Sequence, residues 1–147
     1  MRSLLLGVFL IFSAGAHAVS NVAVTQWTQT VLLNTLTVDS NYSSKDYEQH
    51  SRGFSRNAWN AISGFLGGYI PVIQDHKLSV HPTFLIEPHV VDSGIVDGIH
   101  YWRVNEEVAF PELNIKVAFS LLIIETQPTN NGPFLIQSMD MVKQEYP

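Results

Sequence analysis

The sequence of 147 residues contains no cysteine. This absence excludes a disulfide framework, thiolate zinc sites, iron–sulfur clusters and a cysteine nucleophile. Basic residues are also few, since eight Lys and Arg stand against thirteen Asp and Glu, which gives a formal charge of −5. Proteins that bind nucleic acid concentrate Lys and Arg to neutralise phosphate, so this composition argues against a nucleic-acid partner.

Established catalytic motifs are absent as well. The sequence has no Gly-x-Ser-x-Gly elbow, no Walker loop, no His-Glu-x-x-His and no Gly-x-Gly-x-x-Gly. We therefore predict no catalytic residues, no metal and no cofactor. The length allows one domain, and 46% apolar residues suffice for one core without disulfide or metal support.

The first 18 residues have the pattern of a secretory leader. They combine the basic Arg2, an apolar run over residues 4–12 and a small-residue end at Ala16-His17-Ala18. This run is far shorter than the roughly 20 residues that span a bilayer, which favours a cleaved signal peptide over an anchor. The predicted mature domain is residues 19–147, with no membrane-spanning segment. Small eukaryotic secreted domains usually carry disulfides, so we predict a bacterial protein that is periplasmic or secreted.

Apolar residues recur at three- and four-residue intervals in two segments, which predicts two N-terminal helices. The first covers residues 22–38 and the second residues 54–66. Ser55 is placed to cap the second helix, and Gly67-Gly68 can end it. Residues 39–46 are rich in Ser, Asn and Asp and are predicted to form a turn.

From Lys77 onward, β-branched and aromatic residues predict four strands, over residues 78–91, 100–110, 113–126 and 133–142. Their short connections imply antiparallel hairpins. The predicted fold class is α+β, with two N-terminal helices packed on a curved four-stranded antiparallel sheet. The third strand alternates apolar and polar residues and is the predicted centre, whereas Pro82 and Pro88 place the first strand at an edge or at a bulge.

Four histidines, His76, His81, His89 and His100, gather in the strand region and are the first candidates for acid–base or metal chemistry. On a regular strand His81 and His89 would lie about 26 Å apart at roughly 3.3 Å per residue, so they could not share a metal. Glu87 and His89 could lie on one face, but they supply two ligands where a structural zinc site takes four. We therefore interpret this face as the solvated side of an edge strand.

Two other groups of residues also have a structural explanation. Trp27, Trp59 and Trp102 could form a ligand cage, but their spacing favours core packing. Glu106 and Glu107 could supply a general base, but adjacent strand residues face opposite ways, so they form no carboxylate dyad. One of the two carboxylates could be buried.

Short motifs follow one another in a fixed order through nearly all of residues 22–143. They are Val24-Thr25-Gln26-Trp27, Asp46-Tyr47, Phe54 with Trp59, Glu87-Pro88-His89-Val90-Val91, Gly94-x-x-x-Gly98-x-x-Tyr101-Trp102-x-Val104, Leu121-Leu122-Ile123-Ile124 and Pro133-x-x-Ile136-Gln137. In their order and spacing they resemble the IcmL/DotI family of type IVB (Dot/Icm) secretion systems, which is similar to the conjugative TraM proteins. The resemblance implies a periplasmic domain with a nuclear-transport-factor-like α+β fold, similar to VirB-type assembly factors.

The sequence departs from that family in two places. Family members that form the secretion core carry a transmembrane helix ahead of this domain, whereas this chain offers a short leader. The family tends to have Phe-Thr-Pro-x-Gly-Trp before the second helix, and here the segment is Phe54-Ser55-Arg56-Asn57-Ala58-Trp59. Both departures indicate a soluble IcmL-like paralogue.

Two functions are compatible with these features. The first is a non-enzymatic periplasmic protein-interaction module, whose partners are secretion-system inner-membrane components or the protein itself. Its docking surface would be the outer face of the helices around Tyr42, Tyr47 and Phe54, where aromatics lie among polar residues. The alternative is a small-ligand-binding or enzymatic domain with a conical pocket between helices and sheet.

Overall fold

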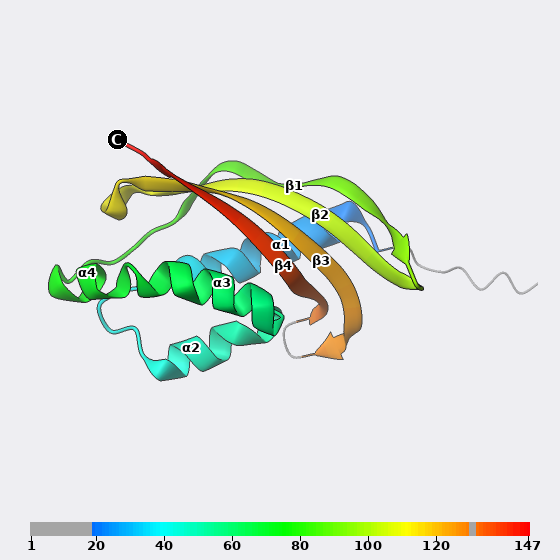
Figure 1. Ribbon diagram of the computed structural model, residues 1–147, viewed down its shortest axis with the longest axis horizontal. Helices are drawn as coiled ribbons and strands as arrows, with labels where there is room; N and C mark the ends of the chain where they lie inside the picture. The colour runs from blue at the N-terminus through cyan, green and yellow to red at the C-terminus, as the bar shows by residue number, and fades with distance from the viewer. Residues whose placement is uncertain (1–18, 130–131) are drawn as a thin grey trace, which may run out of the picture.

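The computed structural model describes residues 19–129 and 132–147, which fold into a layer of helices on one face of a curved sheet (Figure 1). The helices are α1 (Asn21–Leu36), α2 (Ser44–His50), α3 (Arg56–Gly67) and α4 (Ile70–Asp75), with one-turn 3₁₀ helices at Ser51–Gly53 and Pro111–Leu113. The strands are β1 (Thr83–Val96), β2 (Ile99–Phe110), β3 (Ile115–Thr129) and β4 (Gly132–Glu145). None of the helices in these ranges is long and apolar enough to cross a membrane.

The sheet is an open antiparallel meander in the order β1-β2-β3-β4, as predicted. The predicted α+β class is therefore confirmed. β2 and β3 are the interior strands, and they pair without a register shift from Tyr101 opposite Ile124 to Phe110 opposite Ile115. β1 is an edge strand with three register shifts, two of them near Pro88, where the chain cannot donate a ladder hydrogen bond.

The helical layer contains more than the two predicted helices. α1 and α3 confirm those predictions, and the Ser55 hydroxyl accepts a hydrogen bond from the Ala58 amide at 3.1 Å as the cap of α3. The predicted turn over residues 39–46 is wrong in its second half, because α2 begins at Ser44. α4 was not predicted either, since a helix of six residues is too short to show apolar periodicity.

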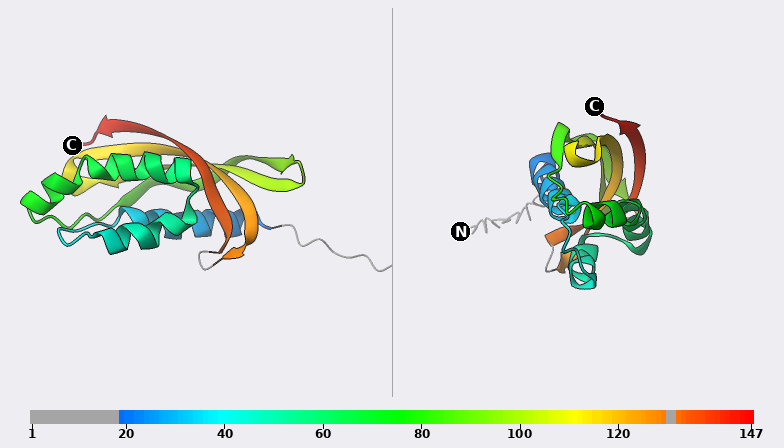
Figure 2. Two further views of the ribbon diagram at one scale, coloured as in Figure 1. Left: turned by 60° about the horizontal axis from the view of Figure 1, so that its bottom comes forward. Right: turned by 90° about the vertical axis from the view of Figure 1, so that its left-hand side faces the viewer.

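The core lies between the helices and the concave face of the sheet (Figure 2). Trp59 of α3 and Trp102 of β2 are buried, as their spacing predicts. Trp27 is partly buried and packs edge-to-face on Phe134, with ring centroids 5.4 Å apart. The largest fully buried side chains come from both layers; they are Trp102, Phe110, Phe119, Leu32, Leu36, Ile62, Ile73, Leu121, Ile123 and Ile136.

Candidate functional site

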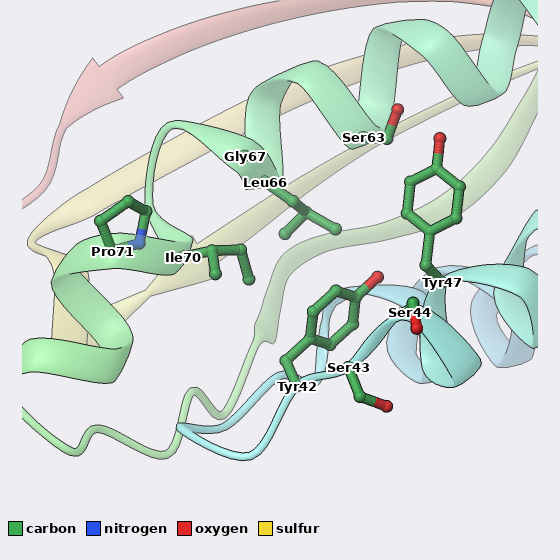
Figure 3. Close-up of a pocket in the computed structure, with 9 residues that line it drawn as sticks. All are labelled: Tyr42, Ser43, Ser44, Tyr47, Ser63, Leu66, Gly67, Ile70 and Pro71. Carbon is green, nitrogen blue, oxygen red and sulfur yellow. The ribbon is translucent and has the colours of Figure 1, made fainter.

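A groove of about 440 Å³ separates α2 from α3 and α4 on the outer side of the helical layer (Figure 3). Tyr42 and Tyr47 lie on one side of it, and Leu66 and Ile70 lie on the other (Figure 3). Its full lining is Tyr42, Ser43, Ser44, Tyr47, Ser63, Leu66, Gly67, Ile70 and Pro71. An apolar floor with several hydroxyl groups and no charged side chain suits the recognition of an apolar surface better than acid–base chemistry.

Hydrogen bonds at the start of α2 fix the tyrosine side of the groove. The Ser43 amide and hydroxyl both donate to the Asp46 carboxylate, at 2.9 and 2.7 Å. These bonds lower the pKa of Asp46, with the side-chain bond from Ser43 the larger cause. Asp46 therefore stays ionised at neutral pH. Its negative charge stabilises the first turn of α2 because it lies at the positive end of the helix dipole.

The two tyrosines differ in their exposure. Tyr47 is 43% exposed and rests edge-on against the buried Trp59, with ring centroids 4.7 Å apart. Tyr42 packs against the core, and burial is the main cause of its raised pKa, with smaller contributions from Asp46 and Tyr47. The raised pKa keeps the Tyr42 phenol neutral at physiological pH, and both rings present aromatic surface to the groove.

The turn between α3 and α4 forms the other side of the groove. The Tyr69 amide donates to the Leu66 carbonyl at 2.8 Å, which closes the turn directly after α3. Pro71 then occupies the first turn of α4, where a missing N–H costs nothing. The short connection holds Leu66 and Ile70 on one wall.

Phe54 does not lie on the surface with the tyrosines. It is 6% exposed and packs on Trp59, with ring centroids 5.4 Å apart. The reason is a contact that the sequence does not reveal, because Phe54 forms a parallel bridge with Ile136 of β4 and the Ser55 amide donates to the Ile136 carbonyl at 2.8 Å. Phe54 therefore supports the groove from beneath and cannot contact a partner directly.

The histidines are not brought together. His81 pairs with Glu112 at 2.9 Å, and the His89 ring contacts the Glu87 carbonyl at 3.1 Å. His81 and His89 are exposed, as the interpretation of a solvated strand face requires. Within residues 19–129 and 132–147, no group of three or more His, Asp or Glu side chains could hold a metal ion.

Several solved protein structures share this fold. No protein-family profile and no curated protein matches the sequence. Among solved structures, the periplasmic domain of DotI is similar with a TM-score of 0.68 and 19% identity, over 87% of this chain and 99% of that one. A periplasmic fragment of TraM is similar with a TM-score of 0.67 and 15% identity, over 86% and 98% of the two chains. This chain has a DotI-like fold.

A third solved structure, an IcmL-like type IV secretion system protein from Legionella pneumophila, is similar with a TM-score of 0.55 and 15% identity, over 87% of this chain and 96% of that one. The resemblance predicted from the motifs is therefore confirmed for the fold. The similar region includes nearly all of the DotI periplasmic domain.

The DotI-like sheet also holds a buried carboxyl group that faces the helices. Glu106 alternates with Trp102, Val104 and Val108 on the buried face of β2 and is only 3% exposed. Both of its oxygens are buried with no hydrogen-bond partner among the described residues, and burial raises its pKa to about 9. Glu107 points the other way and pairs with Lys116 at 3.1 Å. The two carboxylates are not a dyad, and Glu106 is a neutral acid at pH 7.

Proposed function

We propose that the protein is a non-enzymatic periplasmic protein-interaction module that resembles the IcmL/DotI component of a type IVB secretion system, and that the groove between α2, α3 and α4 is its docking site. The observation that carries the proposal is the likeness to two periplasmic domains over 98–99% of their chains. The apolar, uncharged lining of the groove supports it, because the centre of a protein interface is depleted of charged residues. Its partners are secretion-system inner-membrane components or a second copy of the chain.

One observation favours the alternative of a small-ligand binder. The groove volume of about 440 Å³ lies within the range of roughly 300–1,000 Å³ that is common for ligand pockets. Tyr42 and Tyr47 are, however, the only titratable side chains that line it, and burial raises the pKa of Tyr42 further above the neutral range. A general acid or base would have to come from outside the groove. In this alternative the groove would therefore bind a small ligand without catalysing a reaction on it.

The groove is tested by removing its aromatic wall. We expect Tyr42→Ala together with Tyr47→Ala to raise the dissociation constant for self-association or for a secretion-system partner at least tenfold, or about 1.4 kcal/mol. Thr83→Lys on the exposed edge strand β1 should change it little. Sedimentation or pull-down measurements separate the two variants, and the opposite ranking would place docking at the sheet edge.

Two glycines of α3 give a matched pair that leaves the core intact. Gly67 lines the groove and Gly64 does not. A Cβ atom added at either position would have no other atom within 4 Å. Gly67→Phe should therefore fill the groove and weaken binding as strongly as the tyrosine variant. Gly64→Phe should bind as the native protein does. Equal effects of the two variants would remove the groove from the binding site.

We also propose that residues 1–18 are a signal peptide and that the exported domain is residues 19–147. The basic start, short apolar run and small-residue end support this boundary. We expect N-terminal sequencing of protein from the cell envelope to begin at Val19, with recovery that needs no detergent. Protein that retains Met1 and fractionates with the membrane would show an anchored protein instead.

A further inference from the structure

The hairpin of β1 and β2 ends in a cluster of exposed aliphatic side chains. Val91 is 51% exposed, Ile95 65%, Val96 60% and Ile99 49%. Exposed aliphatic residues scattered singly are normal on a protein surface, but several at the end of one hairpin indicate a surface that something else covers. The hairpin tip, defined as these four residues and the turn between β1 and β2, is therefore a candidate contact surface.

The tip is rigid. Asp97 and Gly98 form the turn with positive φ angles of 51° and 78°, which is the geometry of a two-residue turn that matches the twist of its strands. Val96 is directly opposite Ile99 in the register, and Ile95 is opposite His100. A fixed hairpin presents its apolar side chains without paying the ordering entropy of a mobile loop.

Apolar side chains project from both faces of the tip. His100 stacks on the buried Trp102 at 5.0 Å, so His100 and its partner Ile95 lie on the side of the sheet that faces the helices. Val96 and Ile99 lie on the opposite side, because strand residues alternate. One flat protein surface would cover one of these faces, whereas an apolar medium that surrounds the tip covers both.

The position of the tip in the molecule indicates that this apolar medium is a lipid bilayer. The hairpin reaches past the first turn of α1, and both lie at the same end of the molecule in two views (Figures 1 and 2). Val22 in that turn is 61% exposed and adds to the apolar surface of this end. The described part of the chain also begins at this end, because α1 starts at Asn21 (Figure 1).

The approach of this end to a bilayer rests on the signal peptide proposed above, whose apolar run would lie in a bilayer during export. The apolar run ends at Phe12, and eight residues separate it from Asn21. Eight extended residues span at most about 29 Å at roughly 3.6 Å each, so α1 begins within that distance of the membrane while the run is held there. While the run is held in a bilayer, the exposed end of the molecule would therefore lie near a lipid surface.

We propose that the hairpin tip is a membrane-contact site that dips into the interfacial zone of a bilayer, with Ile95, Val96 and Ile99 as the inserted side chains. Asp97 at the turn and Asp92 on β1 are acidic, so the contact is driven by apolar burial and not by attraction to anionic lipid. A few aliphatic side chains give weak, reversible binding, which is compatible with recovery of the protein without detergent.

The test uses protein recovered from the envelope and vesicles of phosphatidylcholine, separated by sedimentation. We expect measurable partitioning that is unchanged between about 0.1 and 1 M salt, over which the screening length falls from about 10 to about 3 Å. Partitioning should also not rise when phosphatidylglycerol is added. Val96→Asp together with Ile99→Asp should lower the partition coefficient at least tenfold. The control, Val72→Asp together with Val142→Asp, adds the same charge at exposed aliphatic positions on α4 and β4 and should leave it unchanged.

Three results would overturn the proposal. They are no partitioning of the native protein, equal partitioning of the tip variant and the native protein, and equal losses in the tip and control variants. A fourth result, loss of self-association by the tip variant in the absence of vesicles, would also overturn it and make the tip an interface between copies of the chain. These outcomes are independent of the docking groove, because no tip residue lines it.

Discussion

The substitution Glu106→Gln is expected to raise the free energy of unfolding by about 3 kcal/mol at pH 7. Folding transfers Glu106 to a site where burial raises its pKa from 4.5 to about 9, so the carboxylate of the unfolded chain must first take up a proton. Each pH unit between these two values costs about 1.4 kcal/mol, and the interval from 4.5 to 7 gives the expected gain. Glutamine has the shape of the protonated acid and needs no proton.

The sign of the pH dependence follows from the same shift. A raised pKa in the folded state gives stability that is complete below pH 4.5 and is lost as the pH rises towards 9. The gain from Glu106→Gln should therefore grow from about 1 kcal/mol at pH 5 to about 5 kcal/mol at pH 8. Urea unfolding of both proteins at several pH values measures this difference.

The adjacent Glu107 provides the control. It is only partly buried and pairs with Lys116, so Glu107→Gln should change stability by less than about 1 kcal/mol. If Glu106→Gln and the native protein showed parallel pH profiles, the Glu106 carboxyl would have a polar partner or solvent contact in solution.

A loss of about 3 to 5 kcal/mol in unfolding free energy is expected for Trp59→Ala. Trp59 lies between Tyr47 of α2 and Phe54, with ring centroids 4.7 and 5.4 Å away, and joins the short helix to α3. Its removal leaves a cavity beneath the docking groove and frees α2 on that side. Partner binding should fall together with stability.

Two variants check this reading of Trp59. Its indole Nε1 is buried with no hydrogen-bond partner among the described residues, so Trp59→Phe loses ring volume without breaking a hydrogen bond and should cost clearly less than Trp59→Ala. His89→Ala at an exposed position of β1 should change stability by within roughly 0.5 kcal/mol. Melting curves rank the three, and a His89 variant as damaging as Trp59→Ala would contradict the assignment of that face to solvent.

The sheet could be predicted from the sequence because its signals are local. Alternation of apolar residues and turn chemistry define each strand, and Pro88 explains the irregular edge. The burial of one of the two adjacent glutamates was also within reach, since Glu106 has the parity of Trp102, Val104 and Val108 along the strand. The sequence could not tell that this carboxyl would have no polar partner, because that depends on the helices packed over it.

The groove could be predicted only in part. Tyr42 and Tyr47 stand out as aromatics in a polar segment, but the opposite wall depends on α4, which shows no apolar periodicity of its own. The prediction that Phe54 lies on the outer surface was wrong for a related reason. Its burial results from pairing with Ile136, which is distant in the sequence, and no local pattern reveals such a contact.

Native purification from the cell envelope tests the proposed docking function most directly, with the native chain and Gly67→Phe compared by mass spectrometry of both proteins and small molecules. We expect the native chain to be recovered with secretion-system components or as a self-associated species. The Gly67→Phe chain should be recovered at the same level without them. Recovery of the native chain alone, with a small molecule that Gly67→Phe displaces, would contradict the interaction function and establish a ligand-binding domain.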